Sequence, residues 1–463
     1  MAPTHAVVLG GGLSGMLAAS VLVRHVDEVT VVERDKLPDG PSPRSGVPQA
    51  KHAHLLMSGG ARAIETVLPG TMDALVAAGA HRIGVPNDLV SLSAQGWVPR
   101  FPEMQFIVSC SRGLLDWVVR SQALRDNKIS VLTGTEPVSL LGDRHAVTGV
   151  LVEDRVSREQ ISLEADLVID ATGRNSRLPA WLTDLGLPEV HSESVDSGLA
   201  YATRIFRAPS SASSGFPIVN VQANPRDPHP GCTATLLPIE DGRWLVTLSG
   251  TRGGEPTTDE SEFVAFARSV RNPVVGELIS QAEPLSPVYG SHSTANRRMF
   301  FERLKSWPSG ILALGDSVAT YNPVYGHGMS IAAQSALVLD AELRSGLVAE
   351  TAQRVQRGIA KVVDGAWAMA TNQDILYPGA VGKPLPLTGR VLQRYVDRLV
   401  RTATTEAPVT RAFLDAFTLS GPMARLVSPA VMWATMRGPR RSVSPEPTLT
   451  AAERERVTGS TSA

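Results

Sequence analysis

The sequence predicts an α/β fold that combines a Rossmann-like domain with a β-rich domain and a C-terminal helical region. Residues 5–35 follow the order strand, glycine-rich turn, helix and strand. In residues 181–284, by contrast, apolar and polar residues alternate as they do in half-buried strands. The expected units are a discontinuous Rossmann-like domain at 1–180 and 285–345, strands of the other domain near 86–110, the β-rich domain at 181–284, a helical region at 346–436 and a mobile tail at 437–463.

The glycine-rich turn begins where a short apolar strand, His5–Leu9, ends. It has the spacing G-x-G-x-x-G, and each glycine has a physical reason. Gly10 permits a tight turn, Gly12 lets backbone approach a pyrophosphate, and Gly15 lets the helix pack closely on the strand. Phosphates would then lie on amide groups at the start of the helix. The contacts predicted here are Gly10, Gly12, Leu13, Ser14 and Gly15.

A second apolar strand, residues 29–32, ends in Glu33 and Arg34. Glu33 follows Gly15 by eighteen residues, close to the spacing of the carboxylate that binds a ribose hydroxyl in dinucleotide-binding domains. The order of strand, turn, helix, strand and acid therefore predicts a dinucleotide site that includes Glu33 and Arg34. The motif alone leaves NAD and FAD both open.

The composition is that of a globular protein with a large core, since 43% of the 463 residues are hydrophobic and 19% are charged. A net charge of −1 without a dense basic run argues against a nucleic-acid partner. Because no apolar run reaches eighteen residues and the chain starts on a strand, we expect no membrane insertion and a cytoplasmic location. Cys110 and Cys232 are far apart and outside any C-x-x-C pattern, so neither a disulfide framework nor a metal site is expected.

Periodicity predicts the remaining elements. Before residue 180 these are helices at 58–78, broken at Pro69-Gly70, and at 112–125, with strands at 89–92, 96–101, 105–110, 130–132, 147–152, 162–165 and 167–170. The β-rich domain has strands at 199–206, 216–221, 233–239 and 243–249, the last two joined by an Asp241-Gly242 hairpin, then helices at 260–270 and 274–282. A buried strand at 311–314 is followed by a long helix that ends near residue 343. Three further helices are predicted at 351–371, 387–402 and 409–419.

Three glycine-bearing turns, at residues 10–15, 170–173 and 315–328, follow predicted parallel strands. Ligands bind outside the carboxyl ends of such strands, so turns far apart in sequence can meet on one long cofactor. An NAD-dependent dehydrogenase normally needs only the first turn, whereas an extended FAD uses all three. The predicted cofactor is therefore FAD.

With these motifs, residues 5–345 resemble the flavin monooxygenases of the para-hydroxybenzoate hydroxylase fold. The resemblance implies that Arg112, followed by Leu115 and Val119, is the arginine of the R-x-x-L-x-x-x-L helix start beside the FAD phosphates and ribityl chain. It also implies that Gly315 and Asp316 are the G-D motif, whose aspartate hydrogen-bonds a ribityl hydroxyl.

The same resemblance assigns Pro323, Gly326, Gly328 and Met329 to the P-x-x-G-x-G turn that opens a helix against the flavin ring. Reduced flavin carries negative charge. Amides of Gly328 and Met329 at a helix N-terminus can stabilise that charge without a lysine or arginine.

One motif departs from the single-component hydroxylases of this fold. Their G-A-D-G-x-x-S pattern, tied to handling NAD(P)H, reads D-A-T-G-R-N-S at residues 170–176. Thr172 therefore stands before Gly173 where the family has an aspartate. We expect a separate flavin reductase, using NAD(P)H, to supply reduced FAD.

Five further stretches resemble the actinomycete polyether-antibiotic epoxidases of the lasalocid and monensin type. They are residues 46–54, 238–244, 250–254, 322–330 and 364–367. This similarity extends over most of the chain. It implies epoxidation of C=C bonds in a linear polyene polyketide during polyether ionophore biosynthesis, in which reduced FAD and O2 form a C4a-hydroperoxide that gives its distal oxygen to the alkene.

Such a transfer needs a dry, apolar pocket rather than a protein nucleophile. The expected pocket walls are Trp97, Phe101, Phe106, Phe206 and Phe216. The candidate catalytic side chains are Tyr325 and His327, which lie in the flavin turn and could order the peroxide. Family resemblance also brings Arg44 and Gln49 near the flavin.

Other functions stay open. A single-component aromatic hydroxylase would oxidise NADPH itself and prefer a phenol. A prenyl-chain reductase shares the D-A-T-G turn and would saturate alkenes without O2. A flavin-dependent halogenase would carry W-x-W-x-I-P, which the sequence does not contain. A non-catalytic flavin-binding protein would bind flavin whose reduced form gives no product with oxygen.

Overall fold

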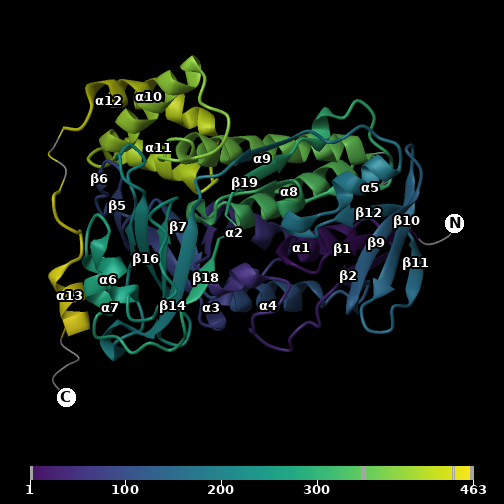
Figure 1. Cartoon of the computed structure of the whole chain (residues 1–463), viewed down its shortest axis with the longest axis horizontal. Helices are drawn as coiled ribbons and strands as arrows, with labels where there is room; N and C mark the ends of the chain where they lie inside the picture. Colours follow the sequence, from purple (N-terminus) through teal and green to yellow (C-terminus); the bar gives the residue numbers. More distant parts are fainter. Residues whose placement is uncertain (1–3, 293, 346–350, 441, 443, 459–463) are drawn as a thin grey trace.

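The computed structural model describes residues 4–292, 294–345, 351–440, 442 and 444–458. It confirms the mixed α/β class, with a parallel sheet towards one end of the molecule and a larger sheet towards the other. Two long helices, α8 (Gly328–Leu343) and α9 (Ala352–Asp374), run along one side (Figure 1).

The parallel sheet has the strand order β20, β12, β1, β2, β8. Its strands are β1 (His5–Leu9), β2 (Glu28–Glu33), β8 (Ile129–Thr133), β12 (Leu167–Asp170) and β20 (Ile311–Ala313), and all neighbours run parallel. The strands β1, β12 and β20 are largely apolar and buried because helices such as α1 (Leu13–Leu22) and α8 cover the sheet. The carboxyl ends of β1, β12 and β20 consequently meet at one edge, and the three glycine-bearing turns leave from there.

Smaller elements complete this half of the molecule. An antiparallel sheet of β9 (Thr135–Gly142), β10 (Val147–Asp154) and β11 (Gln160–Glu164) lies beyond β2 (Figure 1). The predicted helix at 58–78 is α2 (Ser58–Val67) and α3 (Thr71–Ala77), separated at Pro69-Gly70 as expected. The helix that begins at Arg112 is α4 (Arg112–Ala123), and α5 (Leu178–Asp184) follows the second glycine turn.

The larger sheet has the order β18, β14, β17, β16, β15, β5, β6. Its strands are β5 (Leu89–Ser93), β6 (Gly96–Trp97), β14 (Ala200–Arg207), β15 (Ile218–Val221), β16 (Cys232–Ile239), β17 (Arg243–Gly250) and β18 (Tyr289–Ser291). The hairpin between β16 and β17 is confirmed, with positive φ at Asp241 and Gly242. Helices α6 (Phe263–Ser269) and α7 (Val274–Ile279) cover one face of the sheet, so the other face is left for a different role.

Two short sheets join the halves. One consists of β3 (Leu55–Met57), β7 (Gln105–Ser109) and β4 (His81–Val85), and the other of β13 (Ser192–Val195), β19 (Asn296–Met299) and β21 (Ala319–Thr320). The strands expected near 86–110 are therefore divided: β5 and β6 enter the larger sheet, whereas β7 pairs with β3 and β4.

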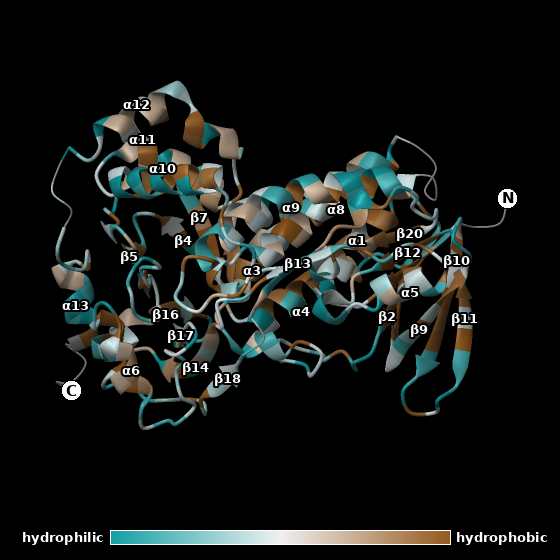
Figure 2. Cartoon of the chain, turned by 45° about the horizontal axis from the view of Figure 1, so that its top comes forward, coloured by the Kyte–Doolittle hydropathy of each residue, from teal (hydrophilic) through white to brown (hydrophobic). Residues whose placement is uncertain are grey.

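The C-terminal helices are α10 (Leu387–Ala403), α11 (Ala407–Phe417) and α12 (Pro429–Arg437). Figure 2 shows apolar residues concentrated around α1, β12 and β20, whereas α10 is largely hydrophilic. The expected boundary at residue 346 and the last five residues of the tail lie outside the described part of the chain. Within that part, no helix combines the length and apolar character needed to cross a membrane.

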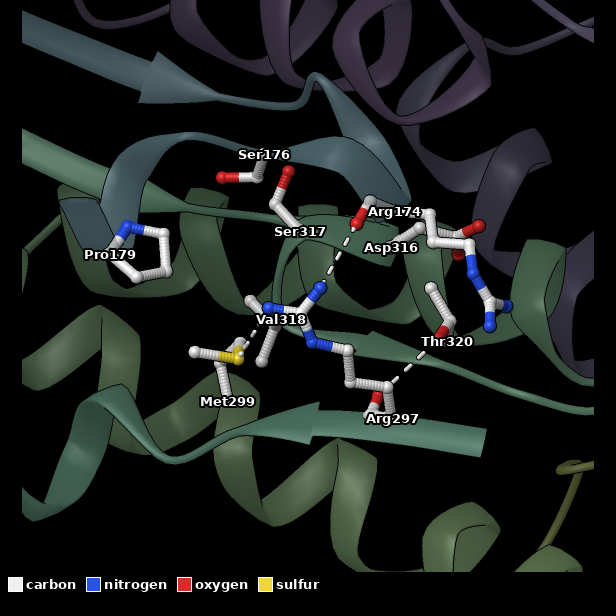
Figure 3. A pocket seen from close by; sticks show the side chains of 9 residues that line it. All are labelled: Arg174, Ser176, Pro179, Arg297, Met299, Asp316, Ser317, Val318 and Thr320. Atoms are coloured by element: carbon white, nitrogen blue, oxygen red, sulfur yellow. Dashed lines mark hydrogen bonds between the residues drawn. The ribbon is translucent and has the colours of Figure 1, made fainter. Parts of the chain in front are cut away.

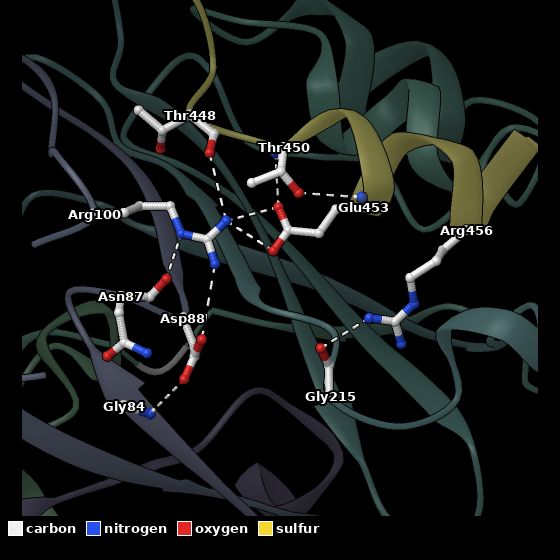
Figure 4. Close-up of polar contacts among 9 residues, drawn as sticks. All are labelled: Gly84, Asn87, Asp88, Arg100, Gly215, Thr448, Thr450, Glu453 and Arg456. Atoms are coloured by element: carbon white, nitrogen blue, oxygen red, sulfur yellow. Dashed lines mark hydrogen bonds and ion pairs between the residues drawn. The ribbon is translucent and has the colours of Figure 1, made fainter. Parts of the chain in front are cut away.

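The segment predicted as a mobile tail contains a helix, α13 (Ala451–Thr458), that contacts the β-rich half (Figure 4). Arg100 donates to both carboxylate oxygens of Glu453, at 2.7 and 2.6 Å. Arg456 donates to the carbonyl oxygens of Ser211, at 2.5 Å, and Gly215, at 3.1 Å. These contacts join the end of the chain to loops of the larger sheet.

Candidate functional site

A cavity of about 480 Å³ is lined by residues of both the parallel and the larger sheet. Its volume lies in the range of ligand and cofactor sites. The three glycine-bearing turns all contribute to its lining, as the parallel strand order predicts. The predicted cofactor-binding residues on the lining are Gly10, Gly12, Leu13, Ser14, Glu33, Arg34, Arg44, Gln49, Arg112, Thr172, Gly173, Asp316, Pro323, Gly326, Gly328 and Met329.

The two other predicted residues, Gly15 and Gly315, support the lining from behind. A Cβ atom on Gly15 would lie 1.8 Å from the carbonyl oxygen of Gly10, and one on Gly315 would lie 2.2 Å from the Ser14 hydroxyl oxygen. Gly10 itself has φ +99°, and a Cβ there would lie 2.6 Å from the Ala171 carbonyl oxygen. The first turn therefore requires glycine at both ends. It leaves the first amide groups of α1, which have no helical partner, beside the cavity.

Glu33 is buried at the end of β2 and is held in place by the backbone. Its Oε2 accepts from the Gly11 amide at 2.8 Å and its Oε1 from the Asp35 amide at 2.9 Å. Arg44 Nη1 lies 2.7 Å from Glu33 Oε2. The buried Nε of Arg44 has no hydrogen-bond partner among the described residues. A carboxylate offers about four acceptor positions, so Glu33 retains one for a sugar hydroxyl.

The hydroxyl group of Thr172 is hydrogen-bonded to Asp170 and is therefore not free to contact a cofactor. The Thr172 hydroxyl and amide donate to Asp170 Oδ1 at 2.6 and 3.0 Å, and the Ser176 hydroxyl donates to the other carboxylate oxygen. Burial raises the pKa of Asp170, although these hydrogen bonds favour the carboxylate. The Gly173 amide donates to the Ser317 hydroxyl at 3.0 Å. The second turn is therefore fixed from within.

Asp316 opens on the cavity and makes no hydrogen bond to any residue that the structure describes. Its depth in the protein raises the pKa of the carboxyl group, against the nearby positive charges of Arg112 and Arg174. Arg112 is oriented by Asp116, whose Oδ1 lies 2.7 Å from Nε. A second pocket has a volume of about 10 Å³, the size of one water, and Asp316 and Arg297 are among its lining residues (Figure 3). Asp316 is thus an acceptor placed for a ligand hydroxyl.

The third turn ends at the N-terminus of α8. Gly326 has φ +67°, and a Cβ there would lie 3.0 Å from Met57 Cε. Asn322 precedes the turn and accepts from the Val324 amide at 3.2 Å. Gly328 and Met329 begin α8, so their free amides and the positive end of the helix dipole lie at the cavity. This end of the cavity favours a negatively charged ligand group.

A buried carboxylate that the sequence analysis did not identify holds this turn. Asp374, at the end of α9, accepts from the Tyr325 hydroxyl at 2.6 Å, from Asn322 Nδ2 at 2.8 Å and from Asn296 Nδ2 at 2.7 Å. Burial raises its pKa, and the three hydrogen bonds favour the charged form. The sequence does contain an indication that Asp374 is buried, because its spacing continues the buried helical stripe of Val363, Trp367 and Ala370.

The two candidate catalytic residues have different surroundings. Tyr325 is committed to Asp374 through its hydroxyl and lies outside the lining residues described for the cavity. His327 lines the cavity, donates from Nε2 to the Phe417 carbonyl at 3.0 Å, and leaves a buried Nδ1 without a described partner. Burial lowers the pKa of His327 to about 4. His327 is therefore a neutral group at neutral pH, and Tyr325 positions the turn.

The prediction of aromatic pocket walls was wrong, since none of the five predicted residues is among the described residues that line the cavity. Trp97, Phe206 and Phe216 pack in the core between the larger sheet and α6 and α7. Phe106 packs beneath two arginines, and Phe101 is half-buried in the loop after β6. The large apolar side chains lie on the face of the sheet that is covered by helices, because burial there stabilises the fold most.

The face that does line the cavity is polar. The residues concerned are Tyr201, Asn220, Gln222, Thr233, Thr235, Thr247, Ser249 and Ser291, together with His52 and His54 from the loop before β3. Strand alternation contains the signal. In β16, Thr233 and Thr235 alternate with Ala234 and Leu236, which lie in the helix-covered core.

The fold and the cavity are similar to those of FAD-dependent oxidoreductases. Residues 6–176 match the family model for FAD dependent oxidoreductase, and this segment contains the first two glycine turns. Over 430 residues the chain is 32% identical to Protein Rv3254 of Mycobacterium tuberculosis, a match that covers 90% of this chain and 89% of that protein. The chain belongs to the family of that protein.

Solved structures support the fold. The flavoprotein/dehydrogenase of Cytophaga hutchinsonii has a TM-score of 0.64 at 14% identity, over 93% of this chain and 96% of that one. A variant of Klebsiella pneumoniae HpxO complexed with FAD has a TM-score of 0.63 at 18% identity, over 91% and 100%. PqsL, a probable FAD-dependent monooxygenase from Pseudomonas aeruginosa, has a TM-score of 0.59 at 18% identity, over 80% and 97%.

The described side chains fit FAD on chemical grounds. Free amides at the start of α1 suit a pyrophosphate, and Glu33 and Asp316 offer acceptors to sugar and ribityl hydroxyls. The unpartnered Nε of Arg44 provides a further donor beside the first turn. The start of α8 at Gly328 suits the negative charge of a reduced flavin ring.

The buried histidines predict how stability depends on pH. Burial lowers the pKa of His52 and His327 to about 4 and that of His54 to about 3. An unfolded histidine titrates near pH ~6.5, so the unfolded chain binds more protons between about pH 4 and 6.5. The stabilisation is present in full above that window and is lost as pH falls through it.

Melting temperatures measured from pH 4 to 8 are expected to rise with pH up to about 6.5. The variant His327→Gln keeps a donor for the Phe417 carbonyl but has no titrating ring, so its rise should be shallower. His191→Gln, at an exposed position, is the matched control and should follow the wild type. Equal slopes for His327→Gln and wild type would contradict the assignment.

Proposed function

We propose that this protein is an FAD-dependent monooxygenase that epoxidises C=C bonds of a linear polyene polyketide in polyether ionophore biosynthesis, with O2 as co-substrate. The observation that carries the proposal is one continuous cavity, which joins the FAD turns, the start of α8 and a broad uncharged sheet face. Two of the stretches that resemble the polyether epoxidases, 46–54 and 322–330, contribute several lining residues to it.

The chemistry that FAD supplies when bound is activation of O2 and delivery of one oxygen atom to the alkene. The protein chain binds the cofactor, orients the substrate and excludes water from the site. Amides of Gly328 and Met329 stabilise negative charge at the start of α8, and Asp374 holds the preceding turn in place. His327, neutral and buried, provides a polar group at the cavity without adding charge there.

We further propose that reduced FAD comes from a separate flavin reductase that uses NAD(P)H, with both proteins in the cytoplasm. This is supported by Thr172, whose hydroxyl is occupied by Asp170. The position that carries an aspartate in single-component hydroxylases therefore offers the cavity no carboxylate.

Aromatic hydroxylation is the second candidate, and the polar sheet face favours it. PqsL, which shares the fold, has been solved in complex with 2-aminobenzoylacetate, an aromatic compound with polar substituents. A cavity lined by Thr235 and Asn220 can hydrogen-bond a substituted ring as well as an oxygenated chain.

One experiment separates these functions. The protein is supplied with FAD and O2 and either a linear polyene ester or a substituted phenol, with and without a flavin reductase and NADH, and products are weighed by mass spectrometry. We expect a gain of one oxygen per alkene that requires the reductase. Equal turnover with NADPH alone would contradict the two-component proposal, oxygenated phenol alone would favour the hydroxylase, and a saturated product would identify a reductase.

A further inference from the structure

The cavity is divided by charge. Its charged lining residues all come from the parallel-sheet half and are Glu33, Arg34, Arg44, Arg112, Glu136, Arg177 and Asp316. Among the described residues that the larger sheet contributes, every one is uncharged: they carry hydroxyl and amide groups only. The charged half matches the FAD motifs, so the uncharged half remains for the substrate.

A hydrogen-bond chain in the uncharged half ends at the cavity. The Ala53 amide donates to the Thr247 hydroxyl oxygen at 3.1 Å, that oxygen lies 2.8 Å from the Thr203 hydroxyl oxygen, and the latter lies 2.8 Å from His52 Nδ1. His52 is mainly neutral above about pH 5, since burial lowers its pKa to about 4.

Counting protons along this chain shows what it offers a ligand. Thr247, Thr203 and the neutral His52 ring have one hydrogen each, and the two links between them use two. Thr203 is fully buried, so the third hydrogen belongs either to His52 Nε2 or to the Thr247 hydroxyl, both on residues that line the cavity. The chain can therefore present a donor at one end and an acceptor at the other, or the reverse.

Neighbouring side chains have spare capacity of the same kind. The Thr235 hydroxyl donates to Asn220 Oδ1 at 2.9 Å, which leaves the Asn220 amino group for a ligand acceptor. The side-chain amide of Gln222 makes no hydrogen bond to any residue that the structure describes, and it lines the cavity. Donors and acceptors are thus spread over several strands rather than gathered at one point.

We propose that the uncharged half selects a neutral substrate that carries hydroxyl or carbonyl oxygens, held by Asn220, Gln222 and the His52–Thr247 chain. This rests on the proposed function and names its substrate class: an oxygenated polyene whose carboxyl end is masked as an ester or thioester. A free carboxylate would lose hydration there without a counter-charge. A pure hydrocarbon chain would leave the donors of the sheet unpaired.

The test uses three synthetic polyenes of equal length: a hydroxylated methyl ester, the same ester without hydroxyls, and the hydroxylated free acid. Binding to the FAD-loaded protein is read from the perturbation of flavin absorbance, and turnover is read by mass spectrometry. The hydroxylated ester should bind at least about tenfold more tightly than either of the others, because a site built for hydrogen bonds rejects analogues that lack them. Equal binding of the ester without hydroxyls, or tightest binding of the acid, would overturn the inference.

Variants assign the selectivity to the sheet face. Gln222→Leu and Asn220→Leu should each weaken binding of the hydroxylated ester by about five- to tenfold while leaving the ester without hydroxyls and FAD affinity unchanged. Thr148→Val, at an exposed position of β10, is the matched strand control. Unaltered selectivity in both Leu variants would contradict the assignment. Selective binding without any oxygenated product would contradict the proposed reaction but not the inferred selectivity of the sheet face.

Discussion

Replacing Gly15 by alanine is expected to abolish stable FAD binding. The added Cβ would lie 1.8 Å from the Gly10 carbonyl oxygen, and because that oxygen belongs to the backbone, no flexible side chain can move to relieve the clash. Either α1 moves away from β1 or the turn opens, and both displace the amides that face the pyrophosphate. FAD affinity should fall at least about a hundredfold, since each tenfold corresponds to about 1.4 kcal/mol.

The measurement is flavin absorbance and fluorescence after reconstitution of the purified apoprotein with FAD. Gly365→Ala, inside helix α9, is the matched control, because a Cβ there would lie 3.5 Å from Met423 Cγ, which is an ordinary van der Waals contact. That control should bind FAD normally and gain up to about 1 kcal/mol of stability from the helix propensity of alanine. Full flavin occupancy in Gly15→Ala would show that the first turn does not hold the pyrophosphate.

Changing Asp374 to asparagine is expected to disrupt the turn before α8. The carboxylate accepts three hydrogen bonds, from Tyr325, Asn322 and Asn296. In an asparagine, an NH2 group replaces one of the two carboxylate oxygens, so at least one of these donors would face another donor and lose its acceptor. Leaving buried donors unsatisfied costs about 1–3 kcal/mol each, so unfolding free energy should fall by about 2–4 kcal/mol. Oxygen transfer should fall at least about tenfold, because the turn positions the amides of Gly328 and Met329.

Chemical denaturation and product yield per NADH consumed measure the two effects. Tyr325→Phe removes only one of the three bonds and should cost about 1 kcal/mol. Asp184→Asn, at the exposed end of α5, is the control for the change of residue type and should behave as wild type. An Asp374→Asn protein with unchanged stability and coupling would mean that the buried carboxylate has no part in holding the turn.

The sequence predicted well wherever local patterns decide the structure. The β1–turn–α1–β2 unit, the Asp241-Gly242 hairpin and the break at Pro69-Gly70 follow from turn chemistry and periodicity, and all are present. The prediction of the pocket walls was wrong for a physical reason. Alternation along β16 indicates two unlike faces but does not say which one meets the cavity, and the apolar face is covered by α6 and α7.

Long-range contacts account for the rest. Asp374 lies far from Tyr325 in the sequence, and nothing local to either residue indicates their hydrogen bond. The same holds for α13, a short polar helix without an apolar stripe, whose position depends on Glu453 meeting Arg100. Neither contact could be derived from the spacing or periodicity of one segment.

The pairing of β5 with β15 has a consequence for how the chain can be divided. β5, at residues 89–93, lies parallel to β15, at 218–221, and β20 closes the other sheet only at 311–313. A ribosome must therefore deliver the chain up to residue 291 before the larger sheet can be completed and up to residue 313 before the parallel sheet can, so the two sheets become complete almost together. No single cut separates the two sheets into fragments that each keep all their strands, so this protein must assemble, and be engineered, as one piece.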